Sequence, residues 1–185
     1  FSTLPMLTEL NGGALTDPRV SVVNADAMKW LEERPDAFDL IVVDFPDPAN
    51  FSIGKLYTSA FYRLLDRHIA PQGLAVIQST SPLYARKSFW TVVKTLESIG
   101  LQTTPYHALV PSFGEWGFVI AGRSEYRPPT AYPVATRFLT PETTPQLFQF
   151  PRDMNRAEAG KLEPNQLNNQ VLVRTFEEEW RKVIR

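Results

Sequence analysis

Apolar residues follow two different periods along the first 122 residues of the chain. Short runs rich in valine and isoleucine, typical of strands, alternate with longer segments in which apolar residues recur every three or four positions, which is typical of helices. Strands separated by helices predict right-handed βαβ units and a largely parallel sheet. The expected fold class is therefore α/β. In chain order the expected strands are Arg19–Asn24, Leu40–Asp44, Leu74–Gln78, Leu101–Val110 and Trp116–Gly122.

The run Leu40–Val43 is apolar without interruption, the pattern of a strand buried on both faces. It stops at two carboxylates, Asp44 and Asp47, which are separated by Phe45 and Pro46. Open α/β sheets bind ligands at the carboxyl ends of their parallel strands, so this segment is a candidate ligand loop. Aspartate and proline also favour turns, so an ordinary strand-ending turn is the alternative.

Helical spacing predicts four further elements in this region. Phe1–Leu10 has the spacing of the end of a helix, and Asp26 is expected to open a short helix that ends near Pro35. Longer helices are expected over Tyr57–His68 and over Phe89–Ile99. Because only a short loop joins the last two expected strands, those strands should be antiparallel neighbours at one edge of the sheet.

The composition and the apolar periodicity of the chain change after residue 122. The remainder is rich in proline and lacks a long periodic segment until the end, where Thr175 and Glu178 have the spacing of a capping box. Phe176, Trp180, Val183 and Ile184 would then form one apolar helix face. We therefore expect a truncated sheet domain over residues 1–122 and a partly helical extension, residues 123–185, packed on it.

The composition of the chain argues against several classes of function. A net charge of −1 gives no general attraction to nucleic acid, and no apolar run approaches the ~20 residues that a membrane-spanning helix needs. The chain has no cysteine, so it has neither disulfides nor thiolate metal sites, and with 2 histidines a histidine-rich metal centre is poorly supported. The proportions of 43% hydrophobic and 21% charged residues are those of an ordinary globular protein.

Two neighbouring carboxylates suit a cationic amine, because a bound ammonium relieves their mutual repulsion. An alkyl ammonium with a pKa of about 10 is only about one part in a thousand neutral at pH 7, a penalty of roughly 4–5 kcal/mol before its nitrogen can attack. A carboxylate that accepts the proton, such as Asp44 or Asp47, would lower that penalty. A Mg²⁺ site is the alternative, since hard cations also favour paired carboxylates.

Four other positions are candidates at the same sheet edge, each with a plainer explanation. Asp26 either caps its helix or accepts a bond from a ligand amino group. Gln78 either lines a pocket or is a satisfied core glutamine. Phe113 and Trp116 either form the wall of a pocket for an apolar methylene chain or belong to a plain hairpin turn over residues 111–117.

Read together, these segments resemble the spermidine synthase (polyamine aminopropyltransferase) family. The resemblance runs from about Asp17 to Gly122 and rests on the order DPRV, NAD, FDLIVVDFPDP, LYTSAFY and VPSFGEWGF. It implies a methyltransferase-like Rossmann sheet, decarboxylated S-adenosylmethionine as co-substrate with no prosthetic group, and a small amine such as putrescine as acceptor. No nucleic acid and no metal is implied.

The resemblance also implies a role for each candidate residue. Asp44 would be the general base on the attacking amine, and Asp47 would bind the amine substrate. Asp26 and the backbone of Ala27 would hold the adenine edge. The remaining candidates would line the amine pocket: Gln78, Phe113 and Trp116. Because the leaving group is a neutral thioether formed from a sulfonium, no general acid is required.

The chain departs from the family pattern in three respects. The glycine-rich loop and the ribose-binding acid have no counterpart, and neither does the family's amino-terminal β-domain. Phe45 and Pro46 replace the small polar residues usual between the two acids. The last 60 or so residues resemble an extension of bacterial relatives that carry membrane segments upstream.

We therefore expect the cytoplasmic, carboxyl-terminal part of a bacterial, membrane-tethered member, inactive as an isolated fragment. The upstream, membrane-embedded segments would then be its partners, and a homo-oligomer is left open. Two other functions also remain open: an S-adenosylmethionine-dependent methyltransferase, and a non-catalytic module that binds polyamines or nucleosides.

Overall fold

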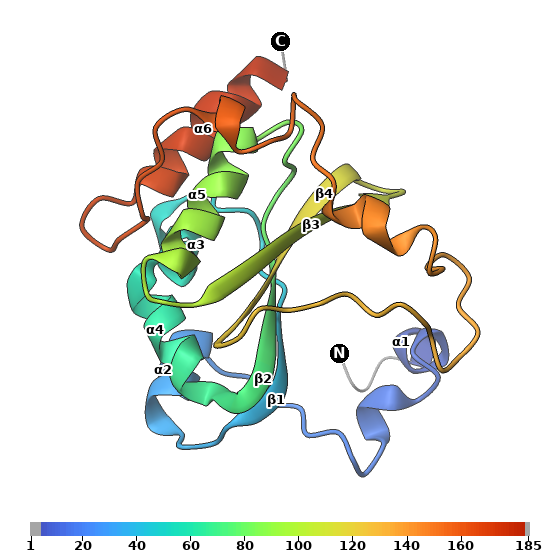
Figure 1. The fold of residues 1–185 in the computed structure, drawn as a ribbon. Coiled ribbons are helices and arrows are strands. Elements are labelled where there is room, and N and C mark those ends of the chain that lie inside the picture. Colours follow the sequence, from blue (N-terminus) through green and yellow to red (C-terminus); the bar gives the residue numbers. More distant parts are fainter. Residues whose placement is uncertain (1–4, 184–185) are drawn as a thin grey trace. The chain divides into compact units, whose positions relative to one another are not determined.

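The computed structural model describes residues 5–183 (Figure 1). The chain divides into two compact units, Phe1–Glu33 and Arg34–Arg185. None of the helices that the structure describes is both long and apolar enough to cross a membrane.

The described part of the first unit, from residue 5 on, contains three helical elements: α1 (Pro5–Leu10), the 3-10 helix η1 (Ala14–Thr16) and α2 (Ala27–Glu33). The expected helices at the start of the chain and after Asp26 are therefore confirmed, although Phe1 and Leu4 lie outside the described residues. The expected strand Arg19–Asn24 is wrong, because this segment has no regular secondary structure. Strand-like composition does not make a strand unless the backbone finds a hydrogen-bonding neighbour.

The second unit carries the sheet. Within the described residues its sheet is 4-stranded, in the order β1-β2-β4-β3. The strands and the helices between them are β1 (Phe38–Val43), α3 (Phe51–Gly54), η2 (Lys55–Tyr57), α4 (Ser59–His68), β2 (Ile69–Gln78), α5 (Arg86–Glu97), β3 (Gln102–Val110) and β4 (Gly114–Gly122).

The strand directions match an α/β fold with a terminal hairpin. β1 and β2 are parallel, whereas β4 runs antiparallel to both β2 and β3, so β1, β2 and β3 share one direction. The expected antiparallel neighbours at one edge are confirmed. β2 begins earlier than expected, at Ile69, because Ile69 already pairs with Phe38 of β1. A bulge that includes Gly73 then separates this pair from the regular segment that starts at Leu74.

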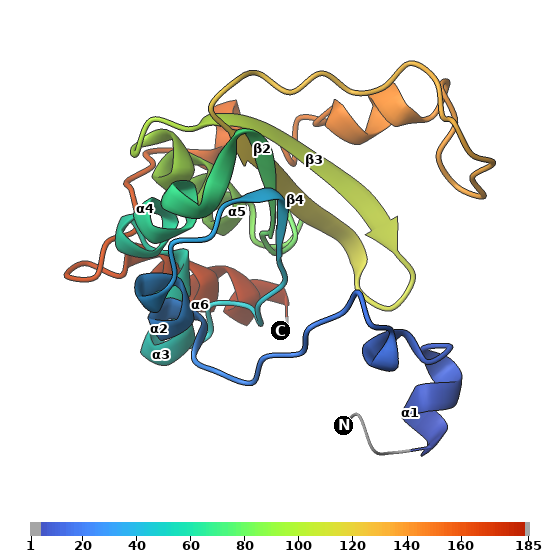
Figure 2. The ribbon, with the colours of Figure 1, turned by 90° about the horizontal axis from the view of Figure 1, so that it is seen from below.

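Helices α3–α6 cover one side of the sheet, and the proline-rich segment after β4 crosses the other (Figures 1 and 2). Alternate residues of β2 and β4 point to the helices and form the core with them, since successive strand residues face opposite sides. The fully buried members of this core include Phe61, Leu65, Ala75, Ile77, Phe89, Val93, Leu96 and Val119.

The expectation that β1 is buried on both faces is wrong. Val43 is 5% exposed, but Leu40 is 60% and Val42 is 67% exposed. β1 lies at the edge of the described sheet, and Leu40 and Val42 alternate with the residue that faces the helices. The uninterrupted apolar run of β1 is therefore buried on only one face of the strand.

The extension continues through two 3-10 helices, η3 (Thr144–Phe148) and η4 (Ala157–Ala159), to α6 (Val171–Val183). The expected capping box is wrong, because α6 begins four residues before Thr175, whose hydroxyl donates back to the Val171 carbonyl at 2.9 Å. Asn169 Oδ1 accepts from the Val171 amide instead, at 3.2 Å. Glu177 and Arg181, one helical turn apart, form an ion pair, and Ile184 lies outside the described residues.

Asn165 fastens the extension to the sheet domain. Its side chain is fully buried; Nδ2 donates to the carbonyls of Gly54 (3.3 Å) and Tyr57 (3.1 Å), while Oδ1 accepts from the Leu172 amide (3.2 Å). Its own amide donates to Thr95 Oγ1 at 2.9 Å. One asparagine thus connects three places in the chain: residues 54–57, α5 and the start of α6.

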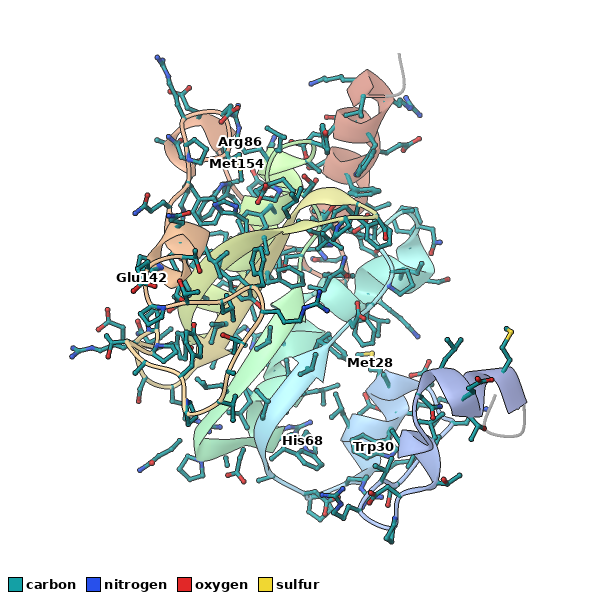
Figure 3. All side chains as sticks on the ribbon, turned by 90° about the vertical axis from the view of Figure 1, so that its right-hand side faces the viewer. Met28, Trp30, His68, Arg86, Glu142 and Met154 are labelled. Carbon is teal, nitrogen blue, oxygen red and sulfur yellow. The ribbon has the colours of Figure 1, made fainter. Side chains whose placement is uncertain are left out.

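A second attachment lies at the start of α5. Arg86 donates to the Asp153 carbonyl at 2.8 Å, and Figure 3 shows Arg86 beside Met154. Trp90 Nε1 donates to the Met154 carbonyl at 2.8 Å. Residues beyond 122 therefore pack on the sheet domain, while the domain boundary at 122/123 stays a prediction.

Candidate active site

The loop after β1, residues 44–48, carries the two acids. Tyr57, which is only 1% exposed, supports this loop from η2: its hydroxyl lies 3.2 Å from the Phe45 carbonyl and 3.1 Å from the Pro46 carbonyl. Burial and the nearby carboxylates Asp47 and Asp44 raise the pKa of Tyr57, so its hydroxyl keeps its proton as a donor.

Phe45 anchors the loop through its side chain. Its ring meets Tyr57 and Phe61 edge to face, with centroid distances of 6.4 and 5.6 Å. Aromatic pairs in this geometry contribute about 0.5–1.5 kcal/mol beyond their buried area. The aromatic residue between the two acids therefore holds the loop against the helices, and Asp44 stays exposed at the end of the strand.

Gln78 at the end of β2 connects this loop to β4. Its amide oxygen accepts from Trp116 Nε1 at 2.7 Å, and its amide nitrogen donates to the Phe45 carbonyl. Because Trp116 offers a donor on one side and Phe45 an acceptor on the other, only one orientation of the Gln78 amide satisfies both. Both sequence interpretations hold: Gln78 is a satisfied glutamine, and it also lines a cavity beside the acid loop.

Asp47 is the more shielded of the two acids. Burial raises its pKa to about 6. Within the described part of the chain, Asp47 Oδ1 and Thr80 Oγ1 are both buried and make no hydrogen bond. Thr80 also has a φ of 62°, a left-handed conformation that is uncommon for a β-branched residue and that clusters at functional sites.

The hairpin turn between β3 and β4 contributes the aromatic wall. Gly114 has a φ of 80°, which lets the chain reverse and brings Phe113 to 5.3 Å from Trp116 between ring centroids. Phe113 is 62% exposed and Trp116 only 8%. Gly117 is required for close approach, because a Cβ there would lie 2.8 Å from the Thr80 carbonyl and 2.5 Å from the Phe89 ring.

These groups border a cavity of about 1110 Å³. Five of the seven candidate residues line it: Asp44, Asp47, Gln78, Phe113 and Trp116. Aromatic and aliphatic side chains on the sheet face opposite the helices complete much of the wall: Val42, Val76, Tyr106, Val110 and Phe118. α6 adds Trp180.

The cavity is therefore acidic at one place and apolar elsewhere. Such a site suits a molecule with an ammonium group and a methylene chain, since the carboxylates pair with the cation and the rings cover the chain. Among the described residues, no third histidine or acid joins Asp44 and Asp47 to make a set of metal ligands.

The remaining candidates, Asp26 and Ala27, belong to the first unit. Asp26 Oδ1 accepts from the amides of Met28 (3.0 Å) and Lys29 (3.2 Å), so it caps α2. The N-cap that the position of Asp26 suggested is thus present, and the adenine contact stays a prediction.

Three residues of the site were missed by sequence reasoning. Tyr57 and Trp180 stood out only as members of apolar helix faces, and Thr80 carried no signal except its place two residues beyond Gln78. A buried tyrosine hydroxyl usually needs a hydrogen-bond partner, but the sequence does not show which loop would supply it.

Comparison with known proteins decides the family. Residues 3–131 match the Spermine/spermidine synthase domain. The chain belongs to the spermine/spermidine synthase family. This confirms the family resemblance drawn from the motifs around Asp44.

Curated relatives of this spermine/spermidine synthase family member extend over the whole chain. It is 59% identical to polyamine aminopropyltransferase 2 of Ralstonia nicotianae, covering 100% of this chain and 36% of that protein. It is 44% identical to a polyamine aminopropyltransferase of Leptospira interrogans, again covering 100% of this chain and 36% of the relative. The chain thus spans about a third of the length of the curated relatives it matches.

Solved structures support the fold. The spermidine synthase of Thermotoga maritima superposes with a TM-score of 0.66 at 19% identity, over 80% of this chain and 52% of that one. A spermidine synthase in complex with the transition state analogue AdoDATO gives the same TM-score of 0.66 at 21% identity, over 78% of this chain and 52% of that one. The expected methyltransferase-like α/β fold is therefore confirmed.

Proposed function

We propose that the full-length protein transfers the aminopropyl group of decarboxylated S-adenosylmethionine to a small amine such as putrescine. The observation that carries this proposal is the pair Asp44 and Asp47 at the carboxyl end of a parallel strand, facing a cavity walled by aromatic rings. The names of the relatives, polyamine aminopropyltransferases, support it.

In the proposed reaction the acceptor nitrogen attacks the aminopropyl carbon bonded to the sulfonium. The new C–N bond forms as the C–S bond breaks, and the bonding electron pair goes to sulfur, which leaves as a neutral thioether. The acceptor nitrogen must lose one proton, and Asp44, exposed to the cavity, would accept it as a general base. The leaving group needs no proton, so a single base suffices.

Asp47 would hold the acceptor ammonium. Its raised pKa reflects a carboxylate that is poorly solvated without a partner, and a bound cation would supply that partner. Tyr57 and Gln78 would position both acids indirectly, since each bonds the backbone between them.

The test is steady-state transfer by the full-length protein, with spermidine and methylthioadenosine as the measured products. We expect Asp44→Asn to lower kcat at least a hundredfold while the KM of the nucleoside co-substrate changes little. An unchanged kcat in that variant would remove Asp44 from the mechanism. Methyl transfer to the amine, in place of aminopropyl transfer, would instead make the protein a methyltransferase.

A second test uses the 185-residue chain alone. We expect it to be inactive and to bind methylthioadenosine weakly or not at all in titration calorimetry, because the glycine-rich loop and the ribose-binding acid of the family have no counterpart in its sequence. Micromolar affinity would show that the nucleoside site is more complete than we propose.

A further inference from the structure

The extension contributes one side chain to the cavity wall. Trp180 of α6 lines it, together with groups from the acid loop, β2 and the β3–β4 hairpin. Its ring packs against Tyr84 and Phe176, with centroid distances of 6.1 and 5.7 Å. Trp180 is thus half-buried, with one side fixed by aromatic neighbours and another on the cavity.

The backbone at Trp180 is fixed by its neighbour Glu179. That carboxylate accepts from the amides of Lys87 (2.7 Å) and Ser88 (3.0 Å) and from Ser88 Oγ (2.6 Å). It therefore caps the N-terminus of α5, where Ala85 at the N-cap position offers no side-chain oxygen. Figure 1 shows α6 alongside α5, the arrangement that this cap requires.

Simple core packing does not account for all of Trp180. A buried tryptophan normally finds an acceptor for its indole N–H, yet Trp180 Nε1 is buried without a hydrogen bond among the described residues. Tryptophan at this position therefore leaves its indole N–H without an acceptor, whereas phenylalanine would fill an apolar site without burying a donor. The indole is also the aromatic group that attracts cations most strongly.

We propose that Trp180 is a specificity-determining residue for the acceptor amine, forming the part of the wall on which the acceptor's methylene chain lies. This inference rests on the proposed function. Asp44 and Asp47 provide the charged groups of the cavity, and Trp116, Phe113 and Trp180 provide ring faces for the chain. A rigid ring contributed by the extension would then limit the length of diamine that fits.

The test compares three diamines, 1,3-diaminopropane, 1,4-diaminobutane and 1,5-diaminopentane, as acceptors for the full-length protein. We expect Trp180→Ala to raise the KM of the preferred diamine about tenfold and to reduce the preference among the three lengths. The KM of the nucleoside co-substrate should stay within twofold. Trp180→Phe, which keeps a ring against Tyr84 and Phe176, should retain most of the length preference, and Arg174→Ala, exposed on the same helix, should match wild type.

The outcomes separate the two proposals. If the wild-type protein transfers no aminopropyl group to any diamine, the proposed function fails, and this inference fails with it. If the wild type is active and Trp180→Ala keeps the wild-type KM and length preference, only the inference is overturned. A parallel rise in both KM values, or an equal loss in Trp180→Phe and Trp180→Ala, would assign Trp180 to holding α6 and would also overturn it.

Discussion

Replacing Asp47 with asparagine should stabilise the ligand-free chain while it weakens amine binding. The carboxylate loses solvation on folding, which raises its pKa from 3.8 to about 6. A shift of about two units corresponds to about 3 kcal/mol, and we reduce this to about 1–2 kcal/mol because the side chain is partly exposed and screened by solvent. Asparagine has nearly the same shape and carries no charge, so it should recover this free energy at pH 8.

The sign of the pH dependence follows from linkage. The folded chain holds the Asp47 proton more tightly than the unfolded chain, so wild-type stability falls as the pH rises from 3.8 to about 6. The Asp47→Asn chain lacks this titration. Its advantage should therefore be complete above pH 7 and fall to about a third at pH 4.5.

The assay is urea unfolding of both chains at pH 8 and pH 4.5. Asp44→Asn is the matched control, because Asp44 belongs to the same loop but is exposed and should show no such gain. A destabilised Asp47→Asn chain at pH 8, or an equal gain in both variants, would refute the argument that burial of this carboxylate costs stability. In the full-length protein the same variant should raise the KM of the amine, and the wild-type KM should rise as the pH falls below about 6.

Two further predictions concern the attachment of the extension, and urea unfolding measures both. Glu179→Ala should lower the free energy of unfolding by about 1–3 kcal/mol, because α5 loses its only described side-chain cap. Glu178 is exposed on the same helix, so Glu178→Ala should change the free energy of unfolding by less than about 0.5 kcal/mol. Equal effects of the two substitutions would contradict the capping role. Asn165→Ala should cost about 2–4 kcal/mol, because it removes the side chain that bonds three buried backbone groups. A change below about 1 kcal/mol would count against this network.

Elements defined by local patterns were predictable. The helices α4 and α5 show the apolar period that buries one face, and the β3–β4 hairpin follows from two apolar runs joined by a short loop. The errors concern the environment of an element. Whether residues 19–24 form a strand depends on a neighbouring strand that pairs with them. Whether Leu40 is buried depends on what covers β1. The local sequence of a segment determines neither of these.

The same distinction applies to the site. Asp44, Asp47, Gln78, Phe113 and Trp116 line one cavity because each stands at a strand end or turn, positions that the sequence marks. Their roles stay predictions. The supporting residues were missed because their signal is tertiary: Tyr57 and Trp180 look like core residues in any helical pattern, and only the fold shows that one supports the acid loop and the other borders the cavity.

Phe45 and Pro46 stood out as a departure from the family pattern, and the structure explains how an apolar pair fits an amine site. A loop between two strand-end acids leaves backbone carbonyls without a ladder partner, and a buried carbonyl needs a donor. Here the Phe45 carbonyl accepts from both Tyr57 and Gln78, the Pro46 carbonyl accepts from Tyr57, and the Phe45 ring packs on the aromatic rings below. Small polar residues would satisfy the loop with their own side chains. This chain satisfies it from the helix and the next strand, so the carboxylates of the loop need not bond its own backbone and stay available to a ligand.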